Sequence, residues 1–405
     1  MRVIPISGLI LSACLFASQA SAQVLQAAAG KLTSYDVHEG ALPDFANAKP
    51  LPLPMSRNAP PSQRDGILNA PNLRHLFGAA KSLQGATGSG ESNPVRLFAP
   101  RENRNAAAPD ADIVPNQFGT QNHPFTTSLV NASGDNTVNF YPYRAAGKLF
   151  FKIGTGSFVC SASMVQHGLA VTAAHCVANY GAKQFYSAWQ FVPAYQNGSA
   201  PFGTWTVAKV WILTAYYAGT DNCFQAGVIC PDDVAILVLK PNGVKKYAGD
   251  YTGYFGVGWN GYSFNGSAQA LISQLGYPVA LNGGSVMERN DSQGFTNAGM
   301  SNNTIIGSLM TGGSSGGPWL VNLGMTPSYG CDSGGCTVKG TGSQHNTVVG
   351  VTSWGYLANA GFYSSMQQGA APFTSGNVCA LINSACFNPR TGRKAACNIT
   401  SPLAC

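Results

Sequence analysis

Short apolar runs, broken every few positions by Gly, Asn or Pro, fill the chain from about residue 120 onward. Several of these runs alternate apolar with polar or small side chains, and none keeps a long helical period. Examples are residues 147–154, 158–165, 206–213, 234–239, 319–321 and 347–354. The 48 glycines and the 10% of charged residues also argue against a helical bundle. The sequence therefore predicts an all-β fold of antiparallel strands, a sandwich or a barrel.

The N-terminus has the features of an export signal. Arg2 precedes an apolar run over residues 3–16, and the small residues Ala20-Ser-Ala22 suit cleavage. We expect residues 1–22 to be a signal peptide and the protein to be secreted, either extracellular or periplasmic. The less favoured alternative is a lipid anchor on Cys14, because Leu-Ser-Ala-Cys14 resembles a lipobox. No other stretch is long and apolar enough to cross a membrane.

The cysteines agree with export. Cys14 aside, there are ten: Cys160, Cys176, Cys223, Cys230, Cys331, Cys336, Cys379, Cys386, Cys397 and Cys405. An even number in an exported chain indicates disulfides. They form five couples close in sequence, so pairing within each couple is the simplest expectation. A zinc site is the alternative, but Cys-x-x-Cys does not occur and His lies near only one couple. We therefore expect no metal and no cofactor.

Composition divides the chain. Eleven of the 24 prolines lie between Pro43 and Pro115, so we interpret residues 23–115 as a propeptide or an extended linker. Residues 116–375 hold the strand-like runs, and residues 376–405 are expected to be a Cys-rich appendage. Proteolytic removal of the N-terminal part is expected near Arg96, Arg101 and Arg104. The net charge of +7 comes without Lys/Arg runs, so we predict no nucleic-acid partner. We also expect the protein to be a monomer.

Three segments carry residues that could act together. Thr311-Gly-Gly-Ser-Ser-Gly-Gly-Pro-Trp319 has glycines on both sides of Ser315, which let a backbone turn sharply and aim two N–H groups at one point. His175 follows an apolar run and precedes Cys176, and Asp233 opens the run to residue 239. Each segment alone has a non-catalytic explanation: a flexible loop, a core histidine or a turn aspartate.

Together the three segments fit one chemistry. A serine hydroxyl attacks well only when an imidazole takes its proton, and the imidazole needs a carboxylate to orient it. His175, Asp233 and Ser315 supply these groups, and their separations of 58 and 82 residues mean that folding must bring them together. We predict that they are catalytic. The neighbouring Asp232 is expected to be a solvated turn residue.

At these motifs the chain resembles the trypsin/chymotrypsin-like serine peptidases. Thr172-Ala-Ala-His-Cys176 and Asp233-Val-Ala-Ile-Leu237 match the histidine and aspartate motifs, and Gly313-Ser-Ser-Gly-Gly-Pro318 matches the serine motif except at one position. The resemblance spans roughly residues 121–370. It implies two six-stranded antiparallel Greek-key β-barrels, divided near residues 240–250, with the active site in the cleft between them. It also implies a serine endopeptidase that works through an acyl-enzyme on protein or peptide substrates.

The resemblance implies further roles. The N–H groups of Gly313 and Ser315 would form the oxyanion hole, and Ser353-Trp354-Gly355 would pair with substrate and wall the specificity pocket. Cys160 and Cys176 match a bridge that ties the histidine loop to a neighbouring strand. Tyr141-Pro-Tyr-Arg-Ala-Ala-Gly147 is similar to bacterial secreted members related to glutamyl endopeptidases.

Some positions depart from the family pattern. Ser314 stands where the digestive enzymes carry the Asp that binds the freed N-terminus, so activation must differ. The pocket-floor position holds Leu309, followed by Met310 and Thr311, with no carboxylate for Lys or Arg. Thr352 replaces the His of glutamyl endopeptidases. We therefore expect a small or apolar P1 residue, with Leu309, Thr311 and Thr352 at the pocket.

The cysteine pattern departs as well. Thr311 stands where many relatives have a pocket-framing Cys. Cys331 and Cys336 are expected instead to close a loop beyond the nucleophile strand, and Cys223 and Cys230 to staple the loop that leads to Asp233.

Two rival interpretations share some of these residues. An α/β-hydrolase would use the same Gly-x-Ser-x-Gly pattern, but it orders its residues as Ser, acid, His, and His345 follows Ser315 too closely for that fold. A catalytically silent binding protein on the same barrels is the second rival. All three catalytic residues are present, which favours an enzyme.

Overall fold

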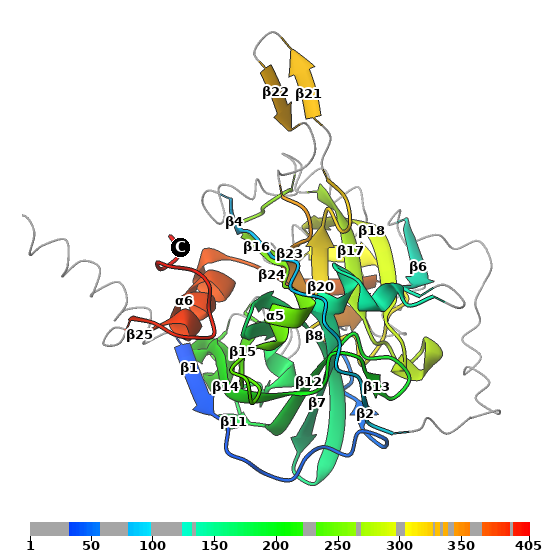
Figure 1. Cartoon of the computed structure of the whole chain (residues 1–405), viewed down its shortest axis with the longest axis vertical. Coiled ribbons are helices and arrows are strands. Elements are labelled where there is room, and N and C mark those ends of the chain that lie inside the picture. Colours follow the sequence, from blue (N-terminus) through cyan, green and yellow to red (C-terminus); the bar gives the residue numbers. More distant parts are fainter. Residues whose placement is uncertain are drawn as a thin grey trace, which may run out of the picture.

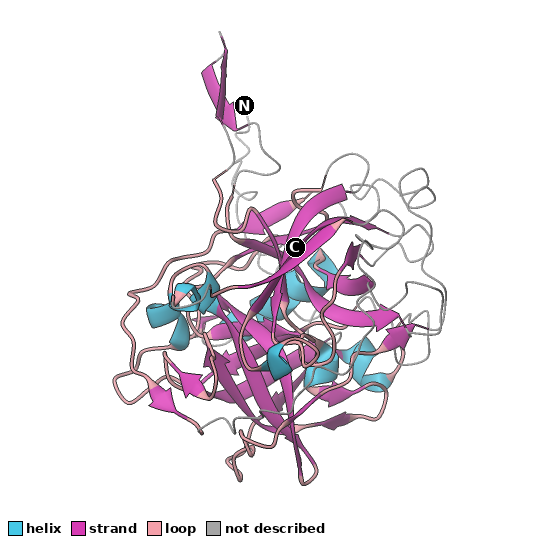
Figure 2. Cartoon of the chain, turned by 90° about the vertical axis from the view of Figure 1, so that its right-hand side faces the viewer, coloured by secondary structure: helices cyan, strands magenta, loops and turns pink. Residues whose placement is uncertain are grey.

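The computed structural model describes residues 32–56, 80–98, 124–131, 135–221, 232–264, 269–296, 304–326, 329–332, 335–338, 344–356, 367–388 and 392–405. Strands dominate this part of the chain, and its helices are few and short (Figure 2). The prediction of a mostly β fold is confirmed. No helix among the described residues has the length and apolar character needed to cross a membrane.

The first half of the body forms a closed barrel of six antiparallel strands. These are β7 (Ala146–Ile153), β8 (Gly156–Gln166), β9 (Leu169–Thr172), β12 (Ser187–Pro193), β14 (Trp205–Leu213) and β15 (Ala235–Leu239). They pair in the order β14-β12-β7-β8-β9-β15, and β15 returns to β14. Large apolar side chains such as Phe151, Trp189 and Phe191 are buried inside. This barrel carries both His175 and Asp233.

The second half forms a second sheet. Its main strands are β17 (Gln269–Gly276), β18 (Glu288–Thr296), β19 (Thr304–Gly307), β20 (Pro318–Val321), β23 (Thr347–Tyr356) and β24 (Gln367–Pro372). They pair in the order β20-β17-β18-β19-β24-β23, and β20 also pairs with β23. β6 (Phe125–Leu129) adds to β18, and β16 (Gly256–Trp259) joins β23 in parallel. The sheet is therefore not purely antiparallel, which the sequence did not predict.

The segment that we interpreted as a propeptide or linker lies along both sheets, in blue to cyan (Figure 1). It contributes β1 (Leu32–Asp36), β2 (Lys49–Pro50), β3 (Met55–Ser56), β4 (Lys81–Leu83) and β5 (Val95–Arg96). These pair with β14, β8, β23, β16 and β13 (Ser199–Ala200) respectively. The strands are two to five residues long, too short for a pattern of alternation to reveal them.

The C-terminal segment packs against the first barrel. Helix α6 (Ala380–Cys386) packs against β14 and β15, and its Leu381 and Ile382 belong to the main hydrophobic core. A five-residue π-helical turn, Ser375–Cys379, leads into it.

The disulfides of this segment are nested. Cys379 bonds Cys405, and Cys386 bonds Cys397. The expected local pairs Cys379–Cys386 and Cys397–Cys405 are therefore wrong. The physical reason is the helix: seven residues of helix span about 10 Å, beyond the reach of a disulfide.

The other three expected cysteine pairs have different outcomes. Cys160–Cys176 is confirmed. Cys331 and Cys336 face each other across the hairpin of β21 (Tyr329–Asp332) and β22 (Gly335–Val338), which projects from the body (Figure 1). The side chains of that couple, and the whole of Cys223 and Cys230, lie outside the described residues.

Short elements complete the described chain. They are α4 (Thr214–Ala218), α5 (Ala248–Thr252), β10 (Ala178–Asn179), β11 (Gln184–Phe185), β25 (Phe387–Asn388) and β26 (Gly392–Arg393), with 3-10 turns at Thr137–Asn139, Tyr143–Ala145, Ala174–Cys176 and Asn282–Gly284.

Candidate active site

His175 and Asp233 are brought together by two paired strands. His175 lies in a 3-10 turn just after β9, and Asp233 lies two residues before β15. Because Thr172 of β9 is the partner of Ala235 of β15, the end of one strand meets the start of the other. His175 Nδ1 is 2.7 Å from Asp233 Oδ2, and the His175 backbone N–H donates to Asp233 Oδ1 at 2.8 Å. The carboxylate thus fixes the position and the orientation of the imidazole.

A third donor completes the surroundings of Asp233. The Ser353 hydroxyl donates to Asp233 Oδ2 at 2.6 Å, and the carboxylate is 1% exposed. A buried carboxylate needs such donors, because burial without partners is costly. That Ser353 contacts substrate stays a prediction, and its side chain in addition supports Asp233. A local motif gives no signal for this contact, since Ser353 comes from the second sheet.

A half-buried phenol, Tyr186, and a buried one, Tyr216, lie close to the same carboxylate. Burial, and then the nearby charge of Asp233, raises the pKa of Tyr186 to about 12 and holds the pKa of Tyr216 well above its ordinary value. Asp232, expected to be solvated, is half-buried, and burial raises the pKa of its carboxyl. That expectation is therefore wrong, because the turn carrying Asp232 is packed into the fold.

Ser315 lies in a tight loop that ends at β20. The loop uses left-handed glycines, with φ of 96° at Gly313 and 75° at Gly316. A Cβ on Gly316 would collide with Thr172 Oγ1, so the loop lies directly against the strand that leads to His175. The Ser315 carbonyl accepts from the Ser161 backbone N–H at 2.7 Å, which ties the loop to β8. Glycine is needed because no other residue fits this close approach.

The two atoms expected to exchange a proton are both buried. Ser315 is fully buried and His175 is 7% exposed. Neither Ser315 Oγ nor His175 Nε2 has a hydrogen-bond partner among the described residues. The structure therefore joins His175 to Asp233, and it places Ser315 on the adjoining loop without a hydrogen bond from its hydroxyl to the imidazole. Buried polar atoms without partners are rare and call for an explanation.

Ser161 is a supporting residue that the sequence analysis missed. Its hydroxyl donates to the Gly313 carbonyl at 2.8 Å and accepts from the Tyr277 backbone N–H at 3.1 Å. It directly follows Cys160, whose disulfide reaches the neighbour of His175. Position beside that cysteine was the one signal that could have identified it.

The predicted pocket residues have different environments. Leu309 is 37% exposed, and Thr311 Oγ1 accepts from the Ala280 N–H at 3.1 Å. Thr352 Oγ1 accepts from Gln274 Nε2 at 2.8 Å and from Trp319 Nε1 at 2.9 Å, so its hydroxyl faces the interior. Trp354 is buried, with its ring against Gly369.

Ser314 differs from the acid of the digestive enzymes. Its hydroxyl donates to the Thr311 carbonyl at 2.7 Å, inside its own loop. The side chain therefore braces the turn before Ser315 and offers no charge to a freed N-terminus.

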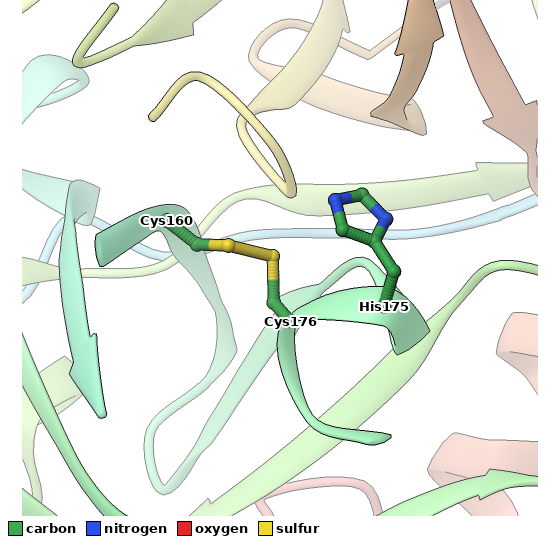
Figure 3. Close-up of side chains that lie close together, drawn as sticks. All are labelled: Cys160, His175 and Cys176. Carbon is green, nitrogen blue, oxygen red and sulfur yellow. A yellow bond between two sulfur atoms is a disulfide. The ribbon is translucent and has the colours of Figure 1, made fainter. Parts of the chain in front are cut away.

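One cluster has the residue types of a metal site. Potential ligand atoms of Cys160, His175 and Cys176 lie within 4.8 Å of one another. The two sulfurs are bonded to each other at 2.03 Å, beside the imidazole (Figure 3), so they offer no thiolate to a metal. His175 Nδ1 is already held by Asp233. The cluster is therefore a bridge next to the histidine and does not fit a metal ion.

Comparison with solved structures found proteins that are similar to part of the chain. The chain is similar to solved serine proteases of the trypsin-like type. One is protease Anisep from Arthrobacter nicotinovorans, with 27% identity, 57% of this chain and 90% of that chain covered, and a TM-score of 0.42.

Two further structures are of the same kind. The thermostable serine protease AL20 from an extremophilic microorganism has 25% identity, coverage of 57% and 93%, and a TM-score of 0.42. A Glu endopeptidase solved in complex with MPD has 16% identity, coverage of 64% and 95%, and a TM-score of 0.44. No protein-family model and no curated protein matches the chain.

Proposed function

We propose that the chain is a secreted serine endopeptidase with His175, Asp233 and Ser315 as its catalytic residues. One observation carries the proposal. Asp233 holds the His175 ring through Oδ2 and the His175 backbone N–H through Oδ1, while His175 Nε2 and Ser315 Oγ are buried with no hydrogen-bond partner among the described residues. An imidazole oriented in this way is what a serine nucleophile needs as its base.

The reaction follows from these groups. Ser315 Oγ attacks the scissile carbonyl as its proton passes to His175 Nε2, and Asp233 stabilises the resulting imidazolium. The N–H groups of Gly313 and Ser315 hold the oxyanion. The C–N bond then breaks and the leaving amine takes the proton from His175. Water hydrolyses the acyl-enzyme with His175 as base, which restores Ser315.

The fold proposal is that the ring of pairings in the second sheet is a second Greek-key barrel. Support comes from β20, which pairs with both β17 and β23 and so closes the ring of strands. The hydrogen bond of Ser353 to Asp233 joins this sheet to the first barrel. The active site would then lie where the two barrels meet.

We also propose a small or apolar P1 residue. Leu309, Met310 and Thr311 bring no carboxylate, and the Thr352 hydroxyl is held in the interior by Gln274 and Trp319. Digestion of a peptide library with the processed protein, read by mass spectrometry, tests this specificity. Cleavage after Arg or Lys would contradict it.

Export is proposed from residues 1–22, which lie outside the described residues, with lipidation of Cys14 as the alternative. The disulfides at Cys160–Cys176, Cys379–Cys405 and Cys386–Cys397 support an oxidising compartment. The substrates would be proteins or peptides, and the protein is expected to act as a monomer without nucleic acid.

The rival is a silent binding protein on the same fold, and a fluorophosphonate probe separates the two. We expect the processed wild type, freed of the N-terminal fragment, to be labelled at Ser315. Labelling should be lost in His175→Ala and kept in His345→Ala, an exposed histidine. A folded wild type that is freed of the N-terminal fragment and still is not labelled would support the binding protein.

A further inference from the structure

Residues 49–56, which we name the cleft segment, run past the residues assigned to substrate binding. At its start, β2 pairs in parallel with β8 at Phe158 and Val159. The Leu51 N–H then donates to the Val159 carbonyl at 3.0 Å. The segment leaves beside β23, where β3 is parallel to Gly355 and Tyr356. The segment therefore spans the site from one half of the molecule to the other.

Two hydrogen bonds fix the segment on groups assigned to substrate. The Gly313 N–H, an expected oxyanion donor, donates to the Leu51 carbonyl at 3.3 Å. The Gly355 N–H, on the strand expected to pair with substrate, donates to the Pro54 carbonyl at 2.8 Å. A bound peptide would need both donors, so it and the cleft segment cannot occupy the site together.

Leu53 anchors the segment. It is 4% exposed, yet it belongs to neither hydrophobic core cluster of the described residues. Its Cδ1 lies 3.8 Å from the position that a Cβ would take on Gly355. Leu53 is therefore buried against the wall of the predicted specificity pocket. An apolar side chain accepted there agrees with an apolar P1 residue.

The sequence of the segment explains its shape. Lys49-Pro-Leu-Pro-Leu-Pro54 places proline at every second position. Proline fixes φ near −65°, and the residue before a proline is held extended. The segment is thus straight before it binds, and little conformational entropy is lost when it lies in the cleft.

The direction of the segment is opposite to that of a substrate. The leaving amine of a substrate must lie beside His175, which protonates it. The Cys160–Cys176 bridge joins His175 to β8, so the chain after the scissile bond must leave on the β8 side. Here it is the upstream part, Lys49 and Pro50, that lies on β8, and the downstream part lies on β23.

We propose that the cleft segment is a built-in inhibitor that occupies the substrate site in reverse, so that the intact chain is held inactive and is not cut by its own serine. This rests on the proposed function. The carbonyl offered to Gly313 belongs to a Leu–Pro bond, and its nitrogen lies away from the side where His175 delivers a proton. Activity requires displacement of the segment, which replaces the charge-based switch that Ser314 cannot provide.

The test compares intact chains, freed of the signal peptide and checked by mass, in Leu53→Asp and in Leu42→Asp. Leu53 is buried in the cleft, whereas Leu42 is 60% exposed in the same N-terminal region. A carboxylate in an apolar subsite drives the segment out. We expect fluorophosphonate to label Ser315 at least about tenfold faster in Leu53→Asp than in the wild type, because the competent fraction rises. Leu42→Asp should label at the wild-type rate.

A second readout does not depend on catalysis. In a Ser315→Ala background, hydrogen exchange of peptides containing Gly313 and Gly355 should accelerate in Leu53→Asp but not in Leu42→Asp. Replacement of residues 49–56 by a Gly/Ser stretch of equal length should accelerate the same exchange as Leu53→Asp does. This second variant keeps the test valid if Leu53→Asp fails to fold.

The outcomes are distinguishable. An intact wild type that labels as fast as Leu53→Asp would overturn the inhibitor and leave the peptidase standing. Hydrogen exchange that stays at the wild-type rate both in Leu53→Asp and in the chain with the Gly/Ser stretch would also overturn the inhibitor. If exchange accelerates in these two chains but fluorophosphonate labels none of the proteins that carry Ser315, the segment lies in the cleft and the peptidase is refuted.

Discussion

Asp232 and Asp233 are neighbours in sequence, but only one of them faces His175. Asp233 accepts three hydrogen bonds, from the His175 backbone, the His175 ring and Ser353. Asp232 is half-buried, and burial raises the pKa of its carboxyl. An aspartate at the start of the strand was readable from the sequence. Which of the two carboxylates faces His175 depends on how side chains alternate along the strand, and the match of residues 233–237 to the family motif indicated Asp233.

The pair gives a matched test. Asp233→Asn should lower kcat by about 10⁴-fold, because the amide favours the wrong tautomer of His175. Asp232→Asn should keep kcat within about twofold, since none of the hydrogen bonds that hold His175 comes from Asp232 and Asn has nearly the same size as Asp. Peptide hydrolysis by the two processed variants measures both. Equal loss in the two variants would contradict the assignment of Asp233.

Lys148 is a buried lysine on the face of β7 opposite Phe151, and its amine reaches residues of the second half of the chain. Its Nζ donates to the Gly284 carbonyl at 2.7 Å and lies 4.7 Å from the ring centroid of Tyr195. Burial lowers the pKa of Lys148 from 10.5 to about 7. The folded chain therefore releases this proton at a lower pH than the unfolded chain. Between these two pKa values the unfolded state binds more protons, so stability rises with pH.

This linkage predicts a pH dependence of stability. The free energy of unfolding of the wild type relative to Lys148→Met should rise from pH 7 to 9.5, by at most about 1.4 kcal/mol per pH unit. Below pH 7 the difference should level off. Urea unfolding at several pH values measures it, and the comparison stays below the range where tyrosines ionise. Parallel curves for the two proteins would refute a depressed Lys148 pKa.

At the scale of elements, the long strands were predictable and the short ones were not. The run 206–213 became β14 over 205–213, and the run 347–354 became β23 over 347–356. Side chains buried along the strand hold both β14 and β23 in place, and these side chains produce an apolar pattern in the sequence. β2 and β3 have two residues each and are held by backbone hydrogen bonds to β8 and β23. Such bonds carry no side-chain pattern.

The same distinction applies to the site. The turn at Thr172–Cys176 and the glycine loop at residues 312–317 are local, so their motifs reveal them. The network of Ser308, Gln274 and Gln368 behind Thr352 is assembled from three strands or loops. Its members share no spacing, and folding alone brings them together.

The nested disulfides give a prediction about the C-terminal elements. Loss of a bridge frees the unfolded chain, and a longer loop costs more. The separations are 26 residues for Cys379–Cys405 and 11 for Cys386–Cys397. Double serine variants should lose about 3.5 and about 2.8 kcal/mol respectively. Denaturant unfolding measures the loss, and peptide mapping without reduction checks the pairing. Recovery of a Cys379–Cys386 linked peptide would contradict the structure.

At the scale of the whole molecule, the N-terminal part is interwoven with both halves of the body. β1 extends the first barrel, the cleft segment crosses to the second sheet, and β4 extends that sheet. Arg96, a predicted processing position, is exposed but paired with Ser199, while Arg101 and Arg104 lie outside the described residues. A single cut in this region therefore breaks one covalent bond and leaves these pairings in place.

We expect limited trypsin cleavage near Arg101 or Arg104 to leave the N-terminal fragment bound. Five strand pairings and the buried side chains of Leu32 and Leu53 hold it, and tethering contributes only an effective concentration. The cut Ser315→Ala protein should show two bands on a denaturing gel and one peak in native size exclusion. The double variant Leu32→Asp with Leu53→Asp should release the fragment, because each change places a carboxylate in an apolar site. A fragment that separates from the cut, otherwise unaltered chain without denaturant would show that cleavage alone opens the cleft.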